Sequence, residues 1–181
     1  MGFVMQTETV KANGLEFHCL SAGSGPLLLC MHGFPDTPHS FVPLMERMSA
    51  QGYRVVAPFM RGYAPTSIQG PYQPAAFGQD VLGLIEALGY EKGFVYGHDW
   101  GTAAAYGAAV LGPDRVEKMI AASVPYGSGM SKALLTDPAQ QRRSWYVFFF
   151  QTPLADISVP LEDFAFIERL WRDWSPGWAL P

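Results

Sequence analysis

Cysteine, basic residues and long apolar runs are all scarce in this sequence of 181 residues. Its two cysteines, Cys19 and Cys30, are too few for a disulfide framework, and we expect both to be inert packing residues. A formal net charge of −4, without a cluster of Lys and Arg, argues against binding to nucleic acid or to an anionic membrane surface. No run is long enough for a transmembrane helix, and the N-terminus lacks the pattern of a signal peptide. These absences predict a globular, cytoplasmic protein.

Charged residues are also few, because they make up 15% of the sequence, against about 25% in a typical soluble domain. A small complete domain has a large surface to solvate. The low value therefore suggests that part of the surface is covered, either by chain beyond residue 181 or by an interface such as that of a homodimer.

Strand and helix patterns alternate over residues 10–125. Residues 27–31 form a continuous apolar run, which is typical of a buried parallel strand. Further strands are expected at residues 16–20, 53–57, 94–96 and 119–124, and helices from a cap at Ser40 to near Gly52 and over residues 77–88 and 102–111. This alternation predicts an α/β fold with a mostly parallel sheet and helices on both faces.

The pattern changes after residue 125, and no strand signal follows. The pair Asp137-Pro138 favours the start of a helix that runs to about residue 151, and Pro160 starts a second helix. We therefore expect two parts, an α/β part at residues 1–125 and a helical part at residues 126–181.

A strand, the sequence Gly97-His98-Asp99-Trp100-Gly101 and a helix follow one another directly. This Gly-x-Asp-x-Gly arrangement is typical of a nucleophile elbow, with Asp where Ser is usual. Larger residues would collide at the two glycines, and the turn places Asp99 at the carboxyl end of the sheet, at a helix N-terminus that favours an anion. An ordinary turn with Asp99 as a helix cap is the alternative, and it would leave both glycines unexplained.

A second motif, His32-Gly33-Phe34-Pro35, follows the buried strand at residues 27–31. The loop after this strand and the residue after the nucleophile can each supply a backbone N–H to an oxyanion hole. We therefore predict that the backbone N–H groups of Phe34 and Trp100 form the oxyanion hole. Substrate contacts are expected from Trp100, Phe34, Pro35 and His32, and His32 is also expected to make structural hydrogen bonds.

With these motifs the chain resembles the α/β-hydrolase family, and within it the epoxide hydrolases. The resemblance is carried by residues 32–35, by Arg61-Gly62-Tyr63 with Ser67, and by residues 97–101, and it covers nearly the whole chain from about residue 10. It implies the α/β-hydrolase fold, with the N-terminal part of the core at residues 1–125 and an incomplete helical cap at residues 126–181. It implies no cofactor and no metal.

An aspartate nucleophile restricts the substrate. A carboxylate that attacked an ester would form an anhydride, whereas one that displaces a leaving group at a saturated carbon forms an alkyl ester that water can hydrolyse. Asp99 therefore indicates an epoxide or a carbon–halogen bond as the group that reacts.

The resemblance separates these two substrates. Epoxide hydrolases of the family hold the epoxide oxygen with cap tyrosines, and the spacing to Phe150-Gln151 matches Tyr146 to one of them, although Tyr146 could instead be an ordinary buried aromatic. Haloalkane dehalogenases usually carry Asn where this chain has Phe34, and haloacetate dehalogenases typically carry Arg where it has Trp100. The prediction is an epoxide hydrolase that opens an apolar epoxide to a diol, with a dehalogenase as the alternative.

No histidine follows Asp99, since the four histidines are His18, His32, His39 and His98. In this family the acid and the histidine base follow the nucleophile along the chain. We therefore expect the acid, the base, a second cap tyrosine and the C-terminal part of the core beyond residue 181. This chain alone is then not expected to turn over an epoxide. The other alternative is a truncated, non-catalytic fragment that dimerises or aggregates.

Overall fold

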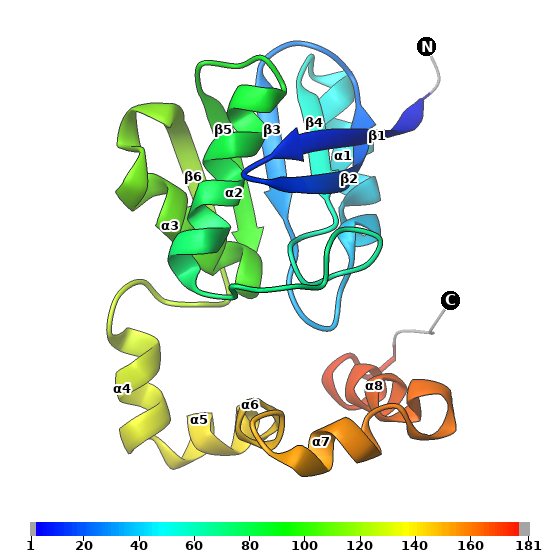
Figure 1. Ribbon diagram of the computed structural model, residues 1–181, viewed down its shortest axis with the longest axis vertical. Coiled ribbons are helices and arrows are strands. Elements are labelled where there is room, and N and C mark those ends of the chain that lie inside the picture. Colours follow the sequence, from blue (N-terminus) through cyan, green and yellow to red (C-terminus); the bar gives the residue numbers. More distant parts are fainter. Residues whose placement is uncertain (1–2, 178–181) are drawn as a thin grey trace. The chain divides into compact units, whose positions relative to one another are not determined.

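The computed structural model describes residues 3–177, and the chain divides into two units, Met1–Pro125 and Tyr126–Pro181. The first unit contains a six-stranded sheet in the order β1-β2-β4-β3-β5-β6 (Figure 1). Its strands are β1 (Met5–Ala12), β2 (Leu15–Ala22), β3 (Leu27–Met31), β4 (Arg54–Pro58), β5 (Gly93–His98) and β6 (Val116–Ala122). Its helices are α1 (Val42–Ala50), α2 (Pro74–Ala87) and α3 (Trp100–Leu111), with short 3-10 turns η1 (Pro38–Phe41) and η2 (Pro113–Arg115).

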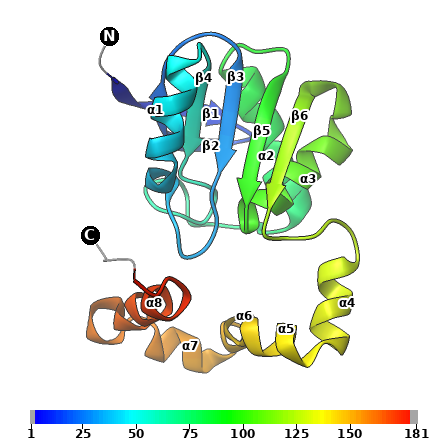
Figure 2. The same cartoon turned by 180° about the vertical axis from the view of Figure 1, so that it is seen from behind.

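The four strands β4, β3, β5 and β6 are parallel, whereas β2 runs antiparallel to both β1 and β4. Every residue of β3 is buried, as its apolar run predicts. Helices α2 and α3 lie on one face of the sheet in Figure 1, and the opposite view in Figure 2 shows α1 beside β4 on the other face. The predicted α/β fold, with a mostly parallel sheet and helices on both faces, is confirmed.

The antiparallel strand β1 is a feature that the sequence patterns did not indicate. It pairs with β2 through a turn at Asn13 and Gly14, which have φ angles of 46° and 75°. Two positive φ angles are what a two-residue hairpin turn requires, and Asn-Gly is the sequence that adopts them most readily. The strand was missed because five of its eight residues are exposed, so it lacks the apolar periodicity of a core strand.

The segment before α1 also differs from expectation. Ser40 was expected to cap this helix, but the N-cap residue of α1 is Phe41, which makes no side-chain cap hydrogen bond. The capping side chain belongs to the 3-10 turn before it, where the hydroxyl of Thr37 accepts a hydrogen bond from the backbone N–H of His39. Pro38 follows at the first position of the 3-10 turn η1, where the missing N–H of proline costs nothing. The first capped turn of this segment is therefore η1, and its cap lies three residues before Ser40.

The sheet face beside α1 carries a groove with a volume of about 690 Å³. Its lining includes the apolar side chains of Leu44 and Met48 from α1, Phe94 and Tyr96 from β5 and Ile120 from β6, together with the polar side chains of Asp36 and His98. Ile120 is 62% exposed. Within residues 3–125, β5 and β6 are therefore exposed on the α1 side of the sheet. On the other side of the sheet they are covered by α2 and α3.

The second unit is helical, as predicted, but its helices are shorter and more numerous. They are α4 (Gly129–Thr136), α5 (Pro138–Arg143), α6 (Trp145–Phe149), α7 (Pro153–Ser158) and α8 (Leu161–Trp174). The single helix expected from Pro138 to about residue 151 is wrong, because the chain turns at Ser144, whose backbone φ and ψ are −99° and 14°. Asp137 caps α5 as predicted, with its carboxylate accepting the N–H of Ala139.

Two further findings concern the described part of the chain as a whole. Over residues 3–177, no helix has both the length and the apolar character needed to cross a membrane. Both cysteines are buried, and burial raises the pKa of each thiol to about 12, so neither forms a reactive thiolate near neutral pH.

Candidate active site

Asp99 lies at the tip of a tight turn between β5 and α3. Its φ and ψ angles are 52° and −123°, a backbone conformation that costs a non-glycine residue on the order of 1–3 kcal/mol. The two flanking glycines allow it, since a Cβ at Gly97 would lie 2.1 Å from the carbonyl oxygen of Gly101, and one at Gly101 would lie 1.9 Å from that of Met31. Both contacts are with backbone atoms, which cannot move aside. The turn therefore requires glycine at both positions.

The loop after β3 meets this turn. The backbone N–H of Phe34 donates a hydrogen bond to Oδ1 of Asp99, with the two atoms 2.8 Å apart. Gly33 makes the approach possible, because a Cβ there would lie 2.2 Å from the same oxygen. The two motifs, which are more than sixty residues apart in the sequence, thus form one site.

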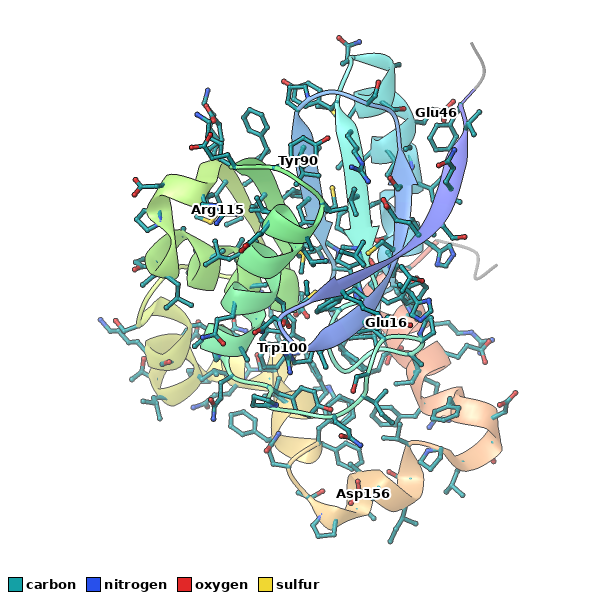
Figure 3. The ribbon with its side chains drawn as sticks, turned by 45° about the horizontal axis from the view of Figure 1, so that its top comes forward. Glu16, Glu46, Tyr90, Trp100, Arg115 and Asp156 are labelled. Carbon is teal, nitrogen blue, oxygen red and sulfur yellow. The ribbon has the colours of Figure 1, made fainter. Side chains whose placement is uncertain are left out.

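Trp100 is the first residue of α3, where backbone N–H groups have no carbonyl partner within the helix. These N–H groups can donate hydrogen bonds to an oxygen atom placed at this end of the helix. Trp100, which Figure 3 labels, is 45% exposed. Its indole lies against Phe77 of α2, with ring centroids 5.8 Å apart. The side chain is thus placed on the surface of the first unit, next to Asp99.

His32 is fully buried, and both of its ring nitrogens are engaged within the protein. Nε2 accepts a hydrogen bond from the backbone N–H of Met60 at 3.1 Å, so the proton is on Nδ1, which faces the carbonyl oxygen of Gly33 at 3.2 Å. The ring also packs edge-on against Tyr63, 4.6 Å away. A direct substrate contact from His32 does not fit this placement, because no part of the ring reaches the surface. Its hydrogen bonds instead join the loop of Phe34 to the loop of Arg61-Gly62-Tyr63.

Burial makes the protonation of His32 unfavourable and lowers its pKa from 6.5 to about 4. Because the unfolded chain binds this proton at a higher pH than the folded chain, the free energy of unfolding should fall as the pH drops from about 6.5 to about 4, by up to about 3 kcal/mol. His32→Gln keeps an acceptor for the Met60 N–H but does not titrate, so it should lose this dependence. Urea unfolding between pH 7 and pH 4 tests this. An equal loss of stability in both proteins would contradict the assignment.

Tyr146 belongs to the second unit, in α6. It is half-buried, and its ring lies 4.8 Å from that of Trp174 and 5.9 Å from that of Phe150. The other half-buried aromatic rings around it include Phe149 and Phe166, which stack at 5.4 Å. Tyr146 is therefore part of an aromatic cluster with its hydroxyl-bearing ring partly exposed.

One residue of the site was not singled out from the sequence. Asp36 follows Pro35, and its carboxylate lies beside His98, as described below. The signal was weak, because a single acidic residue after a turn is common on protein surfaces. Within residues 3–177, no group of three or more His, Cys, Asp and Glu residues is arranged to hold a metal ion.

Comparisons with known proteins identify the family and the fold of this chain. A family model described as the alpha/beta hydrolase fold matches residues 26–163. Epoxide hydrolase 4 of Mus musculus is 33% identical over 174 residues, which are 93% of this chain and 48% of that protein. Epoxide hydrolase 3 of Xenopus tropicalis is 35% identical over 175 residues, which are 93% of this chain and 47% of that protein.

The solved structures include an epoxide hydrolase of Bacillus megaterium in complex with an inhibitor. It is 29% identical, with a TM-score of 0.85, over 92% of this chain and 59% of that chain. The chain spans about half the length of the curated relatives it matches. The similarity thus extends over both units of this chain.

Proposed function

Because the chain belongs to the α/β-hydrolase family, we propose that it carries the nucleophile of an epoxide hydrolase, in which Asp99 opens an apolar epoxide to a diol through an alkyl-enzyme ester. The hydrogen bond from the Phe34 N–H to Oδ1 of Asp99 is the observation that carries this proposal. It joins the half-buried carboxylate of Asp99 to a backbone donor, as nucleophilic attack followed by ester hydrolysis requires. The epoxide hydrolases among its relatives support the choice of substrate.

In the first step, the hydrogen bond to Phe34 leaves Oδ2 of Asp99 as the attacking oxygen. Oδ2 forms a bond to one ring carbon of the epoxide, and the bond from that carbon to the ring oxygen breaks. The ring oxygen keeps the electron pair and takes a proton from the hydroxyl of Tyr146, the donor in this proposal. The product is a β-hydroxyalkyl ester of Asp99.

In the second step, water loses a proton to a base and attacks the carbonyl carbon of the ester. The carbonyl oxygen is Oδ1, which already accepts from Phe34, so the negative charge develops where the N–H groups of Phe34 and Trp100 can stabilise it. The bond to the alkyl oxygen then breaks, and this oxygen takes the proton of the new carboxyl group, so that the diol leaves and the carboxylate is restored. The proton held by the base returns to the phenolate oxygen of Tyr146. Residues 100–181 contain no histidine, so within this sequence the second step lacks the family's base.

The remaining site residues have supporting roles in this proposal. Trp100 and Pro35 line the substrate site with apolar surface beside Asp99, and the side chain of Phe34 does the same. His32 positions the loop through its hydrogen bonds to Met60 and Gly33. The homodimer and the cytoplasmic location remain predictions from composition.

Intact-mass spectrometry tests the proposal directly. After incubation with styrene oxide, the 181-residue chain should gain the mass of one epoxide molecule, and the adduct should persist because hydrolysis lacks its base. Asp99→Asn should show no adduct, since an amide is a poor nucleophile of nearly the same shape. Peptide mapping should place the added mass on Asp99.

Other outcomes would assign the chain differently. Alkylation of Asp99 by a 1-haloalkane, with halide release and no reaction with the epoxide, would favour a dehalogenase. A chain that reacts with neither reagent would overturn the proposal in favour of a non-catalytic fragment. Steady formation of diol by the chain alone would contradict the account of the second step.

A further inference from the structure

The loop at residues 32–36 must hold the Phe34 N–H against Asp99 within a few tenths of an ångström for the hydrogen bond to form. Its first residue is fixed by the contact of His32 with Met60. The loop then turns back, with the N–H of Asp36 donating to the carbonyl oxygen of Gly33 at 2.9 Å. The far end of the loop is fixed by the side chain of Asp36.

The carboxylate of Asp36 has partners on both sides. Oδ1 accepts the backbone N–H of Thr37 at 2.7 Å, and Oδ2 lies 3.4 Å from Nε2 of His98. The two side chains are mostly buried, with 18% of Asp36 and 24% of His98 exposed. The ring of His98 also lies 5.4 Å from that of Phe41, which limits its movement. The contact is thus held from the Asp36 side by the backbone and from the His98 side by packing.

Burial would raise the pKa of Asp36, but hydrogen bonds from His98, Ser40 and the Thr37 backbone together hold it below its ordinary value. Asp36 is therefore a carboxylate at neutral pH, and its contact with Nε2 of His98 brings a charged acceptor against the imidazole ring. A contact of this kind is stronger than one between neutral groups. It is suited to fixing the distance between two backbone segments.

His98 is the last residue of β5, directly before Asp99. The contact therefore joins the loop that carries the hydrogen-bond donor to the residue next to the acceptor. We infer that Asp36 and His98 are a positioning pair, which holds the Phe34 N–H on Oδ1 of Asp99 so that Oδ2 is presented to the substrate. This inference rests on the proposed function. Neither side chain touches the reacting atoms.

The physical effect follows from the freedom of a carboxylate. The χ2 torsion of aspartate is broad, so an unrestrained carboxylate turns readily and presents either oxygen in many directions. A donor fixed on Oδ1 removes this freedom and also lowers the reactivity of that oxygen. Without the pair, the loop at residues 32–36 should shift relative to β5 and the attack should become slower, while the apolar binding surface stays in place.

Two variants of His98 separate hydrogen bonding from packing. His98→Phe keeps a ring beside Phe41 but removes the donor, and it should lower the maximum rate of ester formation with styrene oxide by about 10-fold or more, with little change in the half-saturating concentration. His98→Gln places an amide donor near the position of Nε2 and should restore the rate to within about 3-fold of the unmodified chain. His18→Phe, on β2, is the matched control and should react at the unmodified rate. Thermal unfolding of each variant reports on the fold.

A second measurement does not depend on reactivity. Hydrogen exchange of the Phe34 amide should be faster in His98→Phe and return to its original rate in His98→Gln, with other amides of the sheet unchanged. Equal ester formation in all three proteins, or a loss that Gln does not restore, would overturn the inference. If the unmodified chain forms no ester, the proposed function fails. The hydrogen-exchange rate of the Phe34 amide then decides by itself whether Asp36 and His98 position this N–H.

Discussion

Gly33→Ala is expected to lower the rate of ester formation at Asp99 by about 100-fold or more while leaving the chain folded. A Cβ at position 33 would lie 2.2 Å from Oδ1 and 2.4 Å from Cβ of Asp99. Turning the carboxylate relieves only the first contact, so either Asp99 or the loop must move. Both movements separate the Phe34 N–H from Oδ1. Since Gly33 does not have a positive φ, the backbone itself accepts alanine.

The measurement is the rate of mass gain with styrene oxide, compared with the same substitution at Gly70. A Cβ at Gly70 would make only ordinary contacts, the nearest at 3.5 Å from Tyr72, and this position also lacks a positive φ. Gly70→Ala should therefore react at the unmodified rate. Ester formation by Gly33→Ala at more than a tenth of the unmodified rate would show that the close approach of Gly33 to Asp99 does not position the nucleophile.

The elbow and the loop after β3 were predictable because their requirements are local. A strand that ends in Gly-x-Asp-x-Gly before a helix needs glycine on both sides, since a Cβ at Gly97 or Gly101 would lie 2.1 or 1.9 Å from a backbone oxygen. The apolar run of β3 likewise follows from burial on both faces. These patterns were sufficient to predict that Phe34 and Asp99 lie together.

Features that depend on contacts between distant residues could not be predicted in this way. The contact between Asp36 and His98 depends on the order of the strands, because β3 and β5 are neighbours in space but not in sequence. Burial of His32 depends on Met60 and Tyr63, which the chain brings back from beyond β4. The division of the expected helix at Ser144 has no breaker residue to mark it. Each of these features is set by packing rather than by local pattern.

Breaking the buried ion pair of Arg61 and Asp80 should have the largest effect on stability. Nε and Nη2 of Arg61 donate to the two carboxylate oxygens of Asp80 at 2.8 and 2.7 Å, and the two side chains are only 5% and 2% exposed. Asn13 also donates to Asp80 at 2.7 Å. Asp80→Leu would leave a guanidinium in the core without a partner, which costs about 3–5 kcal/mol of unfolding free energy. Urea unfolding at pH 7 measures this loss.

A double variant and an exposed pair provide the controls. Asp80→Leu combined with Arg61→Met removes both charges and should be no less stable than Asp80→Leu alone, because the cost arises mainly from the unpaired charge. Lys11 and Glu16 lie 3.9 Å apart on the surface, and Glu16→Gln should change the free energy by less than about 0.5 kcal/mol. Arg61→Met alone completes the comparison. If the double variant lost as much free energy of unfolding as Asp80→Leu and Arg61→Met lose in sum, the pair would contribute no coupling and the expectation would be wrong.

The position of this ion pair connects stability to the site. Arg61 directly follows Met60, whose N–H holds the ring of His32, and Tyr63 packs on that ring. Asp80 lies on α2, so the pair fixes the loop of Arg61 to a helix that also carries Phe77, the neighbour of Trp100. Loss of Asp80 should therefore loosen the support of Phe34 and Trp100, the two residues that we propose form the oxyanion hole. Asp80→Leu should slow ester formation even at temperatures where the chain remains folded, whereas Glu16→Gln should not.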